Sequence, residues 1–506
     1  MTTVTMAHDL LVEPVLSWRD ARRRRDIATL PGILARLATG ELADFPRVRA
    51  HQFHPWCMFL TQLAAIALRR AGKTDPQLSE DQWGSILLEL TEGTREPWCL
   101  VVDDLCRPAF FQPPVPEGTI EGWSQSEHPD DIDILVTSKA HDVKSSLISG
   151  DDIEAWILAL VTLQTMQGYS GGAGGYNGIS RMKRGYGSRP RVGLAKSRTP
   201  AARFSRDLPV LLETSAIIVK RGFNPSGLGL AWLAPWDGKS SLGMSELAPH
   251  FIEVCRRLRC RKAGLAVACA YTTSKSRRSL PEIESGDVGD PWIPIEREGG
   301  GALTVGGGGF HYQLLTRILF EGDFEPSAAQ ALRSGDNDPM LFLAAVMVRG
   351  QGKTEGLHER ALLLTAGMRN RLGQPDTRAA IGRRAGEYVQ QAKKMRSKVL
   401  FPALKRISLG ENTPEDEFDA RVDEVFFDDL FRSLDQEEDD ARLTWERRLR
   451  EISWAELQRA IDRCCVPSAR WYQAVSDAEG VFRGSLSKHF PTLVASLQAG
   501  TSTGAA

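Results

Sequence analysis

The sequence has few cysteines, almost no net charge and no long apolar run, and each of these absences excludes a class of protein. Only 8 cysteines are scattered through 506 residues, which argues against a disulfide scaffold and favours the reducing cytoplasm as its location. No stretch approaches the roughly 20 apolar residues of a membrane span, so we expect no membrane partner. Residues 1–16 lack the basic region and apolar core of a secretory signal. The length predicts two or more globular domains.

Recognisable catalytic motifs are also missing. The chain contains no His-Asn-His nuclease pattern, no HD metal cluster and no Gly-x-Ser-x-Gly elbow. Cys255 and Cys260 are close in sequence, but zinc needs four ligands and no second pair stands near them. Residues 352–354, Gly-Lys-Thr, resemble the end of a phosphate loop, yet Met347 stands where its first glycine belongs. We therefore expect no cofactor, no bound metal and no enzymatic activity.

The net charge of −1 hides two segments of opposite charge. Residues 415–440 carry 13 acidic side chains against 2 arginines. Residues 179–206 carry no acidic side chain and nine basic ones, which are Arg181, Lys183, Arg184, Arg189, Arg191, Lys196, Arg198, Arg203 and Arg206. Charge runs are often only solvated surface, but this separation predicts a cationic face that could bind a polyanion.

A glycine-rich segment lies directly before the basic run. Residues 168–178 read Gly-Tyr-Ser-Gly-Gly-Ala-Gly-Gly-Tyr-Asn-Gly. Glycine allows a backbone to approach a ligand closely, and a DNA minor groove about 6 Å wide admits backbone more readily than bulky side chains. A dinucleotide fingerprint fits poorly, because it needs a strand before the glycines and a helix after them, whereas residues 153–167 have helical spacing. A flexible surface loop is the alternative.

Periodicity predicts an α+β fold: a mixed α/β N-terminal domain with irregular loops, residues 1–374, and a C-terminal antiparallel four-helix bundle with a short mobile tail, residues 375–506. In the first domain we expect helices over 54–70, 79–90 and 153–167 and strands over 133–137 and 341–348. The second strand runs into a tight hairpin at 349–353, from which Gln351 and Lys353 project. In the bundle we expect helices over 377–407 and 415–434, a charged helix to 451, a new helix from a capping box at Ser453, and a last helix over 467–489.

Five landmarks occur in an order that resembles the large subunit (CasA) of type I-E CRISPR Cascade complexes. They are Leu-Leu-Val-Glu-Pro at 10–14, Pro-Ala-Phe-Phe-Gln at 108–112, the helix that runs into the glycines at 171–178, Gly-Leu-Ala-Trp at 229–232 followed by 251–255, and the hairpin with the helix after it at 349–360. The landmarks extend over most of the chain. Val15 stands where the family usually has tryptophan. The family's hairpin carries a glutamine that acts as a wedge between base pairs. Here two glycines flank Gln351, so this hairpin departs from the family's pattern.

The resemblance implies a role that is not enzymatic. Such a subunit reads a short protospacer-adjacent motif (PAM) in double-stranded DNA, starts duplex unwinding and helps to recruit a helicase-nuclease. Its expected partners are PAM-bearing duplex, a guide-RNA complex and the Cascade backbone and small subunits. The predicted DNA-binding residues are Gly171, Gly172, Gly174, Gly175, Asn177, Lys183, Arg184, Arg189, Lys275, Arg277, Gln351 and Lys353. Two alternatives stay open: the large subunit of another type I subtype, and a stand-alone metal-dependent nuclease that uses Asp130, Asp131, Asp133 and His141.

Overall fold

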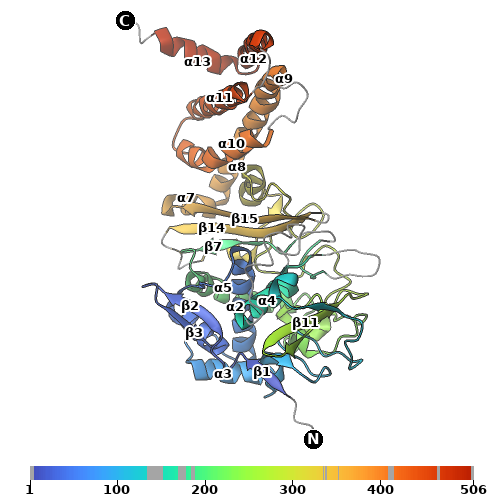
Figure 1. Cartoon of the computed structure of the whole chain (residues 1–506). Helices are drawn as coiled ribbons and strands as arrows, with labels where there is room; N and C mark the ends of the chain where they lie inside the picture. Colours follow the sequence, from blue (N-terminus) through green and yellow to red (C-terminus); the bar gives the residue numbers. More distant parts are fainter. Residues whose placement is uncertain are drawn as a thin grey trace. The chain divides into compact units, whose positions relative to one another are not determined.

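The protein divides into two compact units (Figure 1). The computed structural model describes residues 5–133, 152–168, 178–183, 188–333, 336, 339–350, 353–407, 415–463 and 468–502. Unit 1 comprises Met1–Phe310 and Phe324–Ala366, and unit 2 comprises His311–Asp323 and Gly367–Ala506. The sequence prediction divided the chain once, after residue 374. The structure instead adds a short upstream segment to unit 2, because Tyr312 in that segment packs its ring 4.8 Å from Phe426 of the helical unit.

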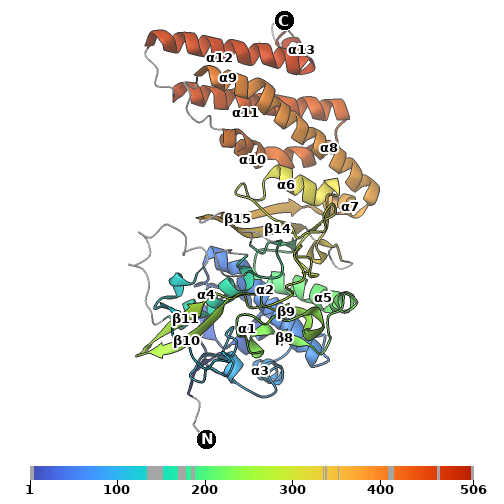
Figure 2. The ribbon, with the colours of Figure 1, turned by 90° about the vertical axis from the view of Figure 1, so that its right-hand side faces the viewer.

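A helix that is buried on all sides, α2 (Ala50–Arg70), runs through unit 1. Periodicity predicted one apolar face over 54–70, whereas every residue from 51 to 68 except Phe53 is buried. The reason is that α2 contacts α4 (Ile153–Met166), α5 (Pro200–Val219) and β9 (Leu247–Ile252) (Figure 2). The predicted helix over 153–167 is confirmed as α4, and Asp152 caps it by accepting from the Ala155 N–H at 3.2 Å.

Small sheets surround these helices, and within the described part of the chain none has more than three strands. Two helices, α1 (Leu30–Thr39) and α3 (Glu80–Glu89), complete the main elements of unit 1, and α3 begins at the predicted capping box of Ser79. The pairings are β1 (Met6–Asp9) with β5 (Cys99–Val102); β3 (Arg25–Ala28), β2 (Leu16–Asp20) and β4 (Leu42–Asp44); β8 (Leu228–Leu230) with β9; β10 (Arg257–Ala263), β11 (Ala266–Thr272) and β6 (Ser124–Ser126); and β12 (Ile295–Glu296) with β13 (Phe324–Glu325).

The predicted hairpin is present, but the helix that the resemblance implied after it is wrong, because residues 353–364 pair with the preceding strand instead. The strand expected over 341–348 is β14 (Met340–Gly350), which pairs with β15 (Lys353–Leu364) on one side and β7 (Arg191–Ala195) on the other. The pairing with β15 reaches Gly350 opposite Lys353, after a bulge at Val348 and Arg349. Residues 133–137, for which a strand was predicted, are described only at Asp133.

Unit 2 is helical, as predicted (Figure 2). Its aromatic core stacks Tyr388 on Trp445 at 4.8 Å, with Phe426 edge-on to both. Figure 2 shows α11 beside α10 and α12 beside α9. Its main helices are α6 (Tyr312–Thr316), α7 (Ala366–Gly373), α8 (Pro375–Lys394), α9 (Phe401–Ile407), α10 (Glu415–Ser433), α11 (Glu438–Asp462), α12 (Ser468–His489) and α13 (Pro491–Ser502). The α+β prediction is confirmed.

One helix boundary in unit 2 was predicted wrongly. The capping-box pattern at Ser453 does not start a helix, because α11 continues through it from Glu438 to Asp462. Ser453 is fully buried, and its hydroxyl donates to the Leu449 carbonyl one turn earlier at 2.7 Å. Residues 499–502, expected in a mobile tail, are helical in α13. None of the described helices is long and apolar enough to cross a bilayer.

Candidate nucleic-acid interface and its buried frame

The described structure contains both ends of the predicted glycine segment. The Ile179 N–H donates to the Gln167 carbonyl at 2.9 Å, and Gln167 also forms an isolated bridge with Ser188. The chain therefore leaves α4 and returns at the same place. The four glycines predicted to bind DNA lie outside the described residues, together with three other predicted DNA-binding positions. These are Gly171, Gly172, Gly174, Gly175, Asn177, Arg184 and Gln351.

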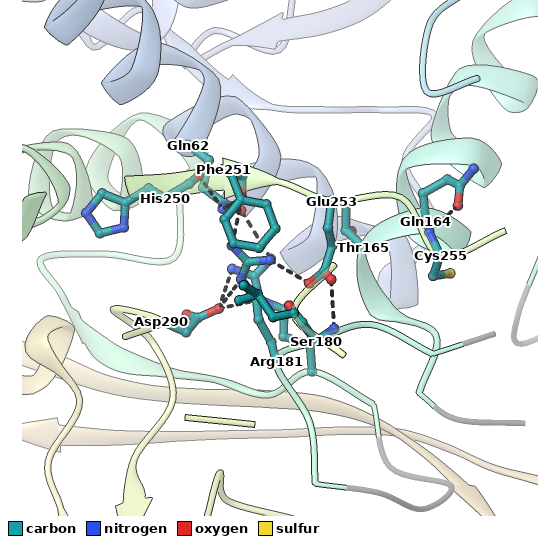
Figure 3. A network of polar contacts seen from close by, with 12 residues as sticks. Gln62, Gln164, Thr165, Ser180, Arg181, His250, Phe251, Glu253, Cys255 and Asp290 are labelled. Carbon is teal, nitrogen blue, oxygen red and sulfur yellow. Dashed lines mark hydrogen bonds and ion pairs between the residues drawn. The ribbon is translucent and has the colours of Figure 1, made fainter. Parts of the chain in front are cut away.

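A buried arginine fixes the returning end of this segment (Figure 3). Arg181 is 3% exposed and lies 2.5 Å from Glu253 and 3.0 Å from Asp290. It also donates to the Phe251 carbonyl at 2.7 Å and covers the Phe251 ring at 4.3 Å. The second carboxylate oxygen of Glu253 accepts from the Ser180 N–H at 2.7 Å. Residues 180 and 181 are thus tied to the end of β9 through side chain and backbone.

A second buried arginine extends the network to α2. Arg189 is 1% exposed, and two of its nitrogens lie 2.7 and 2.6 Å from Asp290 Oδ2. It donates to the Gln62 amide oxygen at 3.1 Å, and the Gln62 amide donates to the His250 and Phe251 carbonyls at 3.0 and 3.2 Å. Burial lowers the pKa of Arg189 to about 10, so its charge remains at neutral pH. We call Arg181, Arg189, Glu253 and Asp290 the buried frame.

A glutamine in the last turns of α4 holds the other end. The Gln164 amide donates to the carbonyls of Phe111 and Arg256 at 3.0 and 2.9 Å. Its oxygen accepts from the Cys255 and Arg256 N–H groups at 2.8 and 2.9 Å (Figure 3). All four hydrogen-bonding positions of this buried amide are therefore occupied, as a polar group in a core requires. Sequence reasoning missed the roles of Gln164, Gln62, Glu253 and Asp290; Glu253 lies in the landmark at 251–255, but its partners Ser180 and Arg181 are distant in sequence.

The predicted cationic face is wrong for most of the basic run in its described part. Five of its members are buried, and most are neutralised by carboxylates within the protein. Arg191 lies 2.7 Å from Asp207, and Arg206 lies 3.2 Å from Asp336. Arg203 covers the Phe53 ring at 4.7 Å. Lys196 and Arg198 are exposed and Lys183 is half-buried, so the run mainly anchors the fold.

The other described residues that were predicted to bind DNA differ in exposure and in the groups they contact. Lys275 is exposed, and its N–H donates to the Gly238 carbonyl at 2.7 Å. Arg277 is 5% exposed and donates to the Ile283 carbonyl at 2.7 Å, so it supports a loop from inside. Lys353 is the first residue of β15. Lys183 pairs with Glu296 at 2.6 Å. Arg189 and Arg277 therefore hold protein groups, and the accessible cations are Lys183 and Lys275.

The carboxylates of the nuclease alternative have structural partners. Asp130 pairs with Arg49 at 2.6 Å. Asp133 is fully buried against His51 at 2.8 Å, and Asp131 accepts from the Ser126 hydroxyl at 3.1 Å. His141 lies outside the described residues. Among the described residues no group of three His, Cys, Asp or Glu side chains could hold a metal ion.

The cysteines considered for zinc are separated in the fold. The Cys255 thiol donates to the Leu163 carbonyl at 3.3 Å, whereas Cys260 lies opposite Cys269 in the β10–β11 pair. Each thiol is buried. This is the ordinary packing of a small apolar side chain.

Two of the landmark segments meet in the core of unit 1. Phe111, from residues 108–112, stacks on Trp232, from residues 229–232, with ring centroids 4.5 Å apart. Gln112 accepts from the Cys260 N–H at 2.6 Å and donates to the Leu100 carbonyl at 2.8 Å. The landmarks thus include residues that set the position of the α4 end and of β10.

The fold and the buried frame define a two-unit α+β protein in which a buried amide holds one end of a glycine-rich segment and buried charges hold the other. Solved structures with this fold exist. The chain matches Cse1 from Acidimicrobium ferrooxidans with a TM-score of 0.60 at 16% identity, over 96% of this chain and 98% of that chain. It matches CasA (Cse1) of Thermus thermophilus with a TM-score of 0.60 at 13% identity, over 95% of this chain and 100% of that chain.

A chain of a CRISPR RNA-guided surveillance complex also matches, with a TM-score of 0.57 at 14% identity, over 94% of this chain and 100% of that chain. No family model matches the sequence, and no curated protein matches it. The resemblance to CasA read from the landmarks is therefore confirmed in the fold: the protein has the fold of the Cse1 (CasA) proteins over nearly its whole length.

Proposed function

We propose that this protein is the large, non-catalytic subunit of a CRISPR RNA-guided surveillance complex. In this role it recognises a PAM in double-stranded DNA, starts duplex unwinding and helps to recruit a helicase-nuclease. Its partners are then PAM-bearing duplex, the guide-RNA complex with its backbone and small subunits, and the nuclease. Guide pairing reads the remaining target sequence, and the protein contributes only the short motif and the first strand separation.

The observation that carries the proposal is the full-length match in fold to Cse1 proteins, together with the fixed ends of the glycine segment. A short backbone loop can enter a minor groove reproducibly only if its ends are held, because glycine gives the segment many conformations to lose. The Gln167–Ile179 hydrogen bond and the Ser180–Glu253 contact supply that restraint. Of the described residues predicted to bind DNA, Lys183 and Lys275 have side chains accessible to flanking phosphates.

The test uses the assembled complex with its guide RNA. The probe is double-stranded DNA that carries a guide-matched target flanked by randomised bases, and the bound fraction is sequenced. Gly172→Asp should abolish the selection of flanking bases, since a carboxylate is repelled by the phosphates that line the groove. Gln351→Ala should keep the selection and slow strand opening, measured with 2-aminopurine in the target. Gly306→Asp is the matched control, because Gly306 is exposed in a different glycine turn with no neighbour within 4 Å.

Wild-type selection in Gly172→Asp would contradict the assignment of the glycine segment, and wild-type strand opening in Gln351→Ala would contradict the assignment of Gln351. Cleavage of plasmid by the purified protein with magnesium, lost in Asp133→Ala, would support the nuclease alternative instead. The second alternative, the large subunit of another type I subtype, receives less support because several of the solved structures that match are described as Cse1 or CasA. A complex purified with this protein and analysed for its other subunits separates the two subtypes.

A further inference from the structure

A half-exposed ion pair joins the returning end of the glycine segment to a second glycine turn. Lys183 Nζ lies 2.6 Å from Glu296 Oε2, and the two side chains are 37% and 34% exposed. Lys183 ends the described run 178–183, two residues after Arg181. Glu296 ends the short strand β12. The pair therefore lies at the edge of the buried frame, at the position where the chain returns from the glycine segment.

The turn at residues 299–301 forms a seat for the lysine. A Cβ atom placed on Gly301 would lie 1.7 Å from Lys183 Cε, so the aliphatic stem occupies the space that the glycine leaves free. The Glu296 N–H donates to the Gly301 carbonyl at 2.8 Å, and the Gly300 N–H donates to the Glu296 carbonyl at 2.9 Å. These bonds hold the carboxylate and the glycine next to the same side chain.

Exposure distinguishes this pair from the ion pairs around it. Arg181 and Arg189 are almost completely buried with their carboxylates, and a buried guanidinium cannot leave its partner without a large cost. A pair as exposed as Lys183–Glu296 contributes little, because water competes for both groups. A phosphate that approaches from solvent can therefore replace the carboxylate on the Lys183 ammonium.

We propose that Glu296 is a positioning residue that holds Lys183 in its seat until a DNA phosphate displaces it. The inference rests on the proposed function, and the ligand is the phosphodiester backbone of duplex DNA. While Glu296 carries its charge it repels the incoming phosphate, so it limits binding that does not depend on base sequence. Stable binding to DNA then depends more on recognition of the motif than on contacts with the phosphate backbone.

The experiment measures the affinity of the assembled complex for guide-unmatched duplex DNA over a range of salt concentrations. Glu296→Gln keeps an oxygen that can accept from Lys183 but removes the charge, and it should tighten binding roughly two- to fivefold. Gly301→Ala should tighten it similarly, because the new methyl group displaces the flexible end of Lys183 from the carboxylate. Gly306→Ala is the control and should leave affinity unchanged, since a Cβ there meets nothing within 4 Å.

Lys183→Met gives the readout that a structural role would not affect. It should weaken binding and reduce the slope of log affinity against log salt by about 0.9, the contribution of one phosphate contact. In the Lys183→Met background, Glu296→Gln should bring a clearly smaller gain, because only the direct repulsion between the carboxylate and the phosphate is then removed. A gain of the same size in that background, or an unchanged salt slope in Lys183→Met, would overturn the inference. If the wild-type complex did not bind duplex DNA at all, the proposed function would be refuted instead.

Discussion

Replacement of Arg181 by methionine tests whether the buried frame holds the returning end of the glycine segment. The change removes the guanidinium partner of Glu253, which is 2% exposed and, among the described residues, would keep only the Ser180 N–H as a hydrogen-bond donor. Asp290 would keep both of its contacts with Arg189, at 2.7 and 2.6 Å. The loss therefore falls mainly on one uncompensated buried carboxylate, and breaking such a pair costs about 3–5 kcal/mol.

Two further variants set the scale of this effect. Arg181→Met combined with Glu253→Met removes both charges and leaves the Ser180 N–H without its acceptor, a cost of about 1–3 kcal/mol, so the double variant should be more stable than Arg181→Met alone. Arg221→Met is the matched control. Arg221 makes two contacts with Asp287, at 2.8 and 2.5 Å, but the side chains are 40% and 24% exposed. Its loss should cost no more than about 1 kcal/mol.

Hydrogen–deuterium exchange of peptides from α4 and β9 is the appropriate assay, because the two compact units can unfold separately and a single melting curve would mix them. Arg181→Met should speed exchange in both peptides by roughly two orders of magnitude or more, since about 1.4 kcal/mol corresponds to a factor of ten. An Arg181→Met effect no larger than that of Arg221→Met would refute the reasoning from burial.

Two more changes test buried positions near the frame. Burial, and then the charges of Arg203 and Arg191, lower the pKa of His54 to about 3. Because the unfolded chain takes up this proton near pH 6.5, the free energy of unfolding falls by up to about 1.4 kcal/mol per pH unit from pH 6.5 down to pH 3. His54→Leu should reduce that loss by about 2 kcal/mol at pH 5, measured by urea unfolding of unit 1. Gly286→Ala should destabilise unit 1 by about 1–3 kcal/mol more than Gly264→Ala does. Both glycines have positive φ, but of the two only Gly286 would place a Cβ against backbone, 2.6 Å from the Met182 carbonyl carbon. Equal shifts of the melting temperature in the two variants would contradict this packing argument.

Local signals predicted the elements that local interactions determine. The serine at position 79 accepts from an N–H three residues later, so its pattern alone marks the start of α3. The same kind of pattern at Ser453 failed because tertiary packing continued the helix and turned the hydroxyl to the Leu449 carbonyl. A capping motif predicts a helix start only where the preceding residues are not already helical.

The buried frame could not be predicted, because its pairs are distant in sequence. Arg181 is 72 residues from Glu253, and Arg189 is 101 residues from Asp290. From the sequence, a run of nine basic residues with no acidic residue inside it indicates an exposed cationic surface. Nothing in its spacing distinguishes that surface from a set of internal ion pairs with remote carboxylates. The sequence predicted that the glycine segment follows a helix, but it did not predict the contacts that hold the two ends of the segment.

The buried charges follow from the need to hold a short segment in one register. Apolar contacts are non-directional, so packing alone would tolerate small shifts of residues 178–183 along β9. A carboxylate such as Glu253 accepts from one backbone N–H and one guanidinium at once, and both bonds weaken if the chain shifts by one residue. Apolar replacements could match the frame in stability. We infer that it is retained because it fixes where the chain returns from the glycine segment, and with it the position of Lys183.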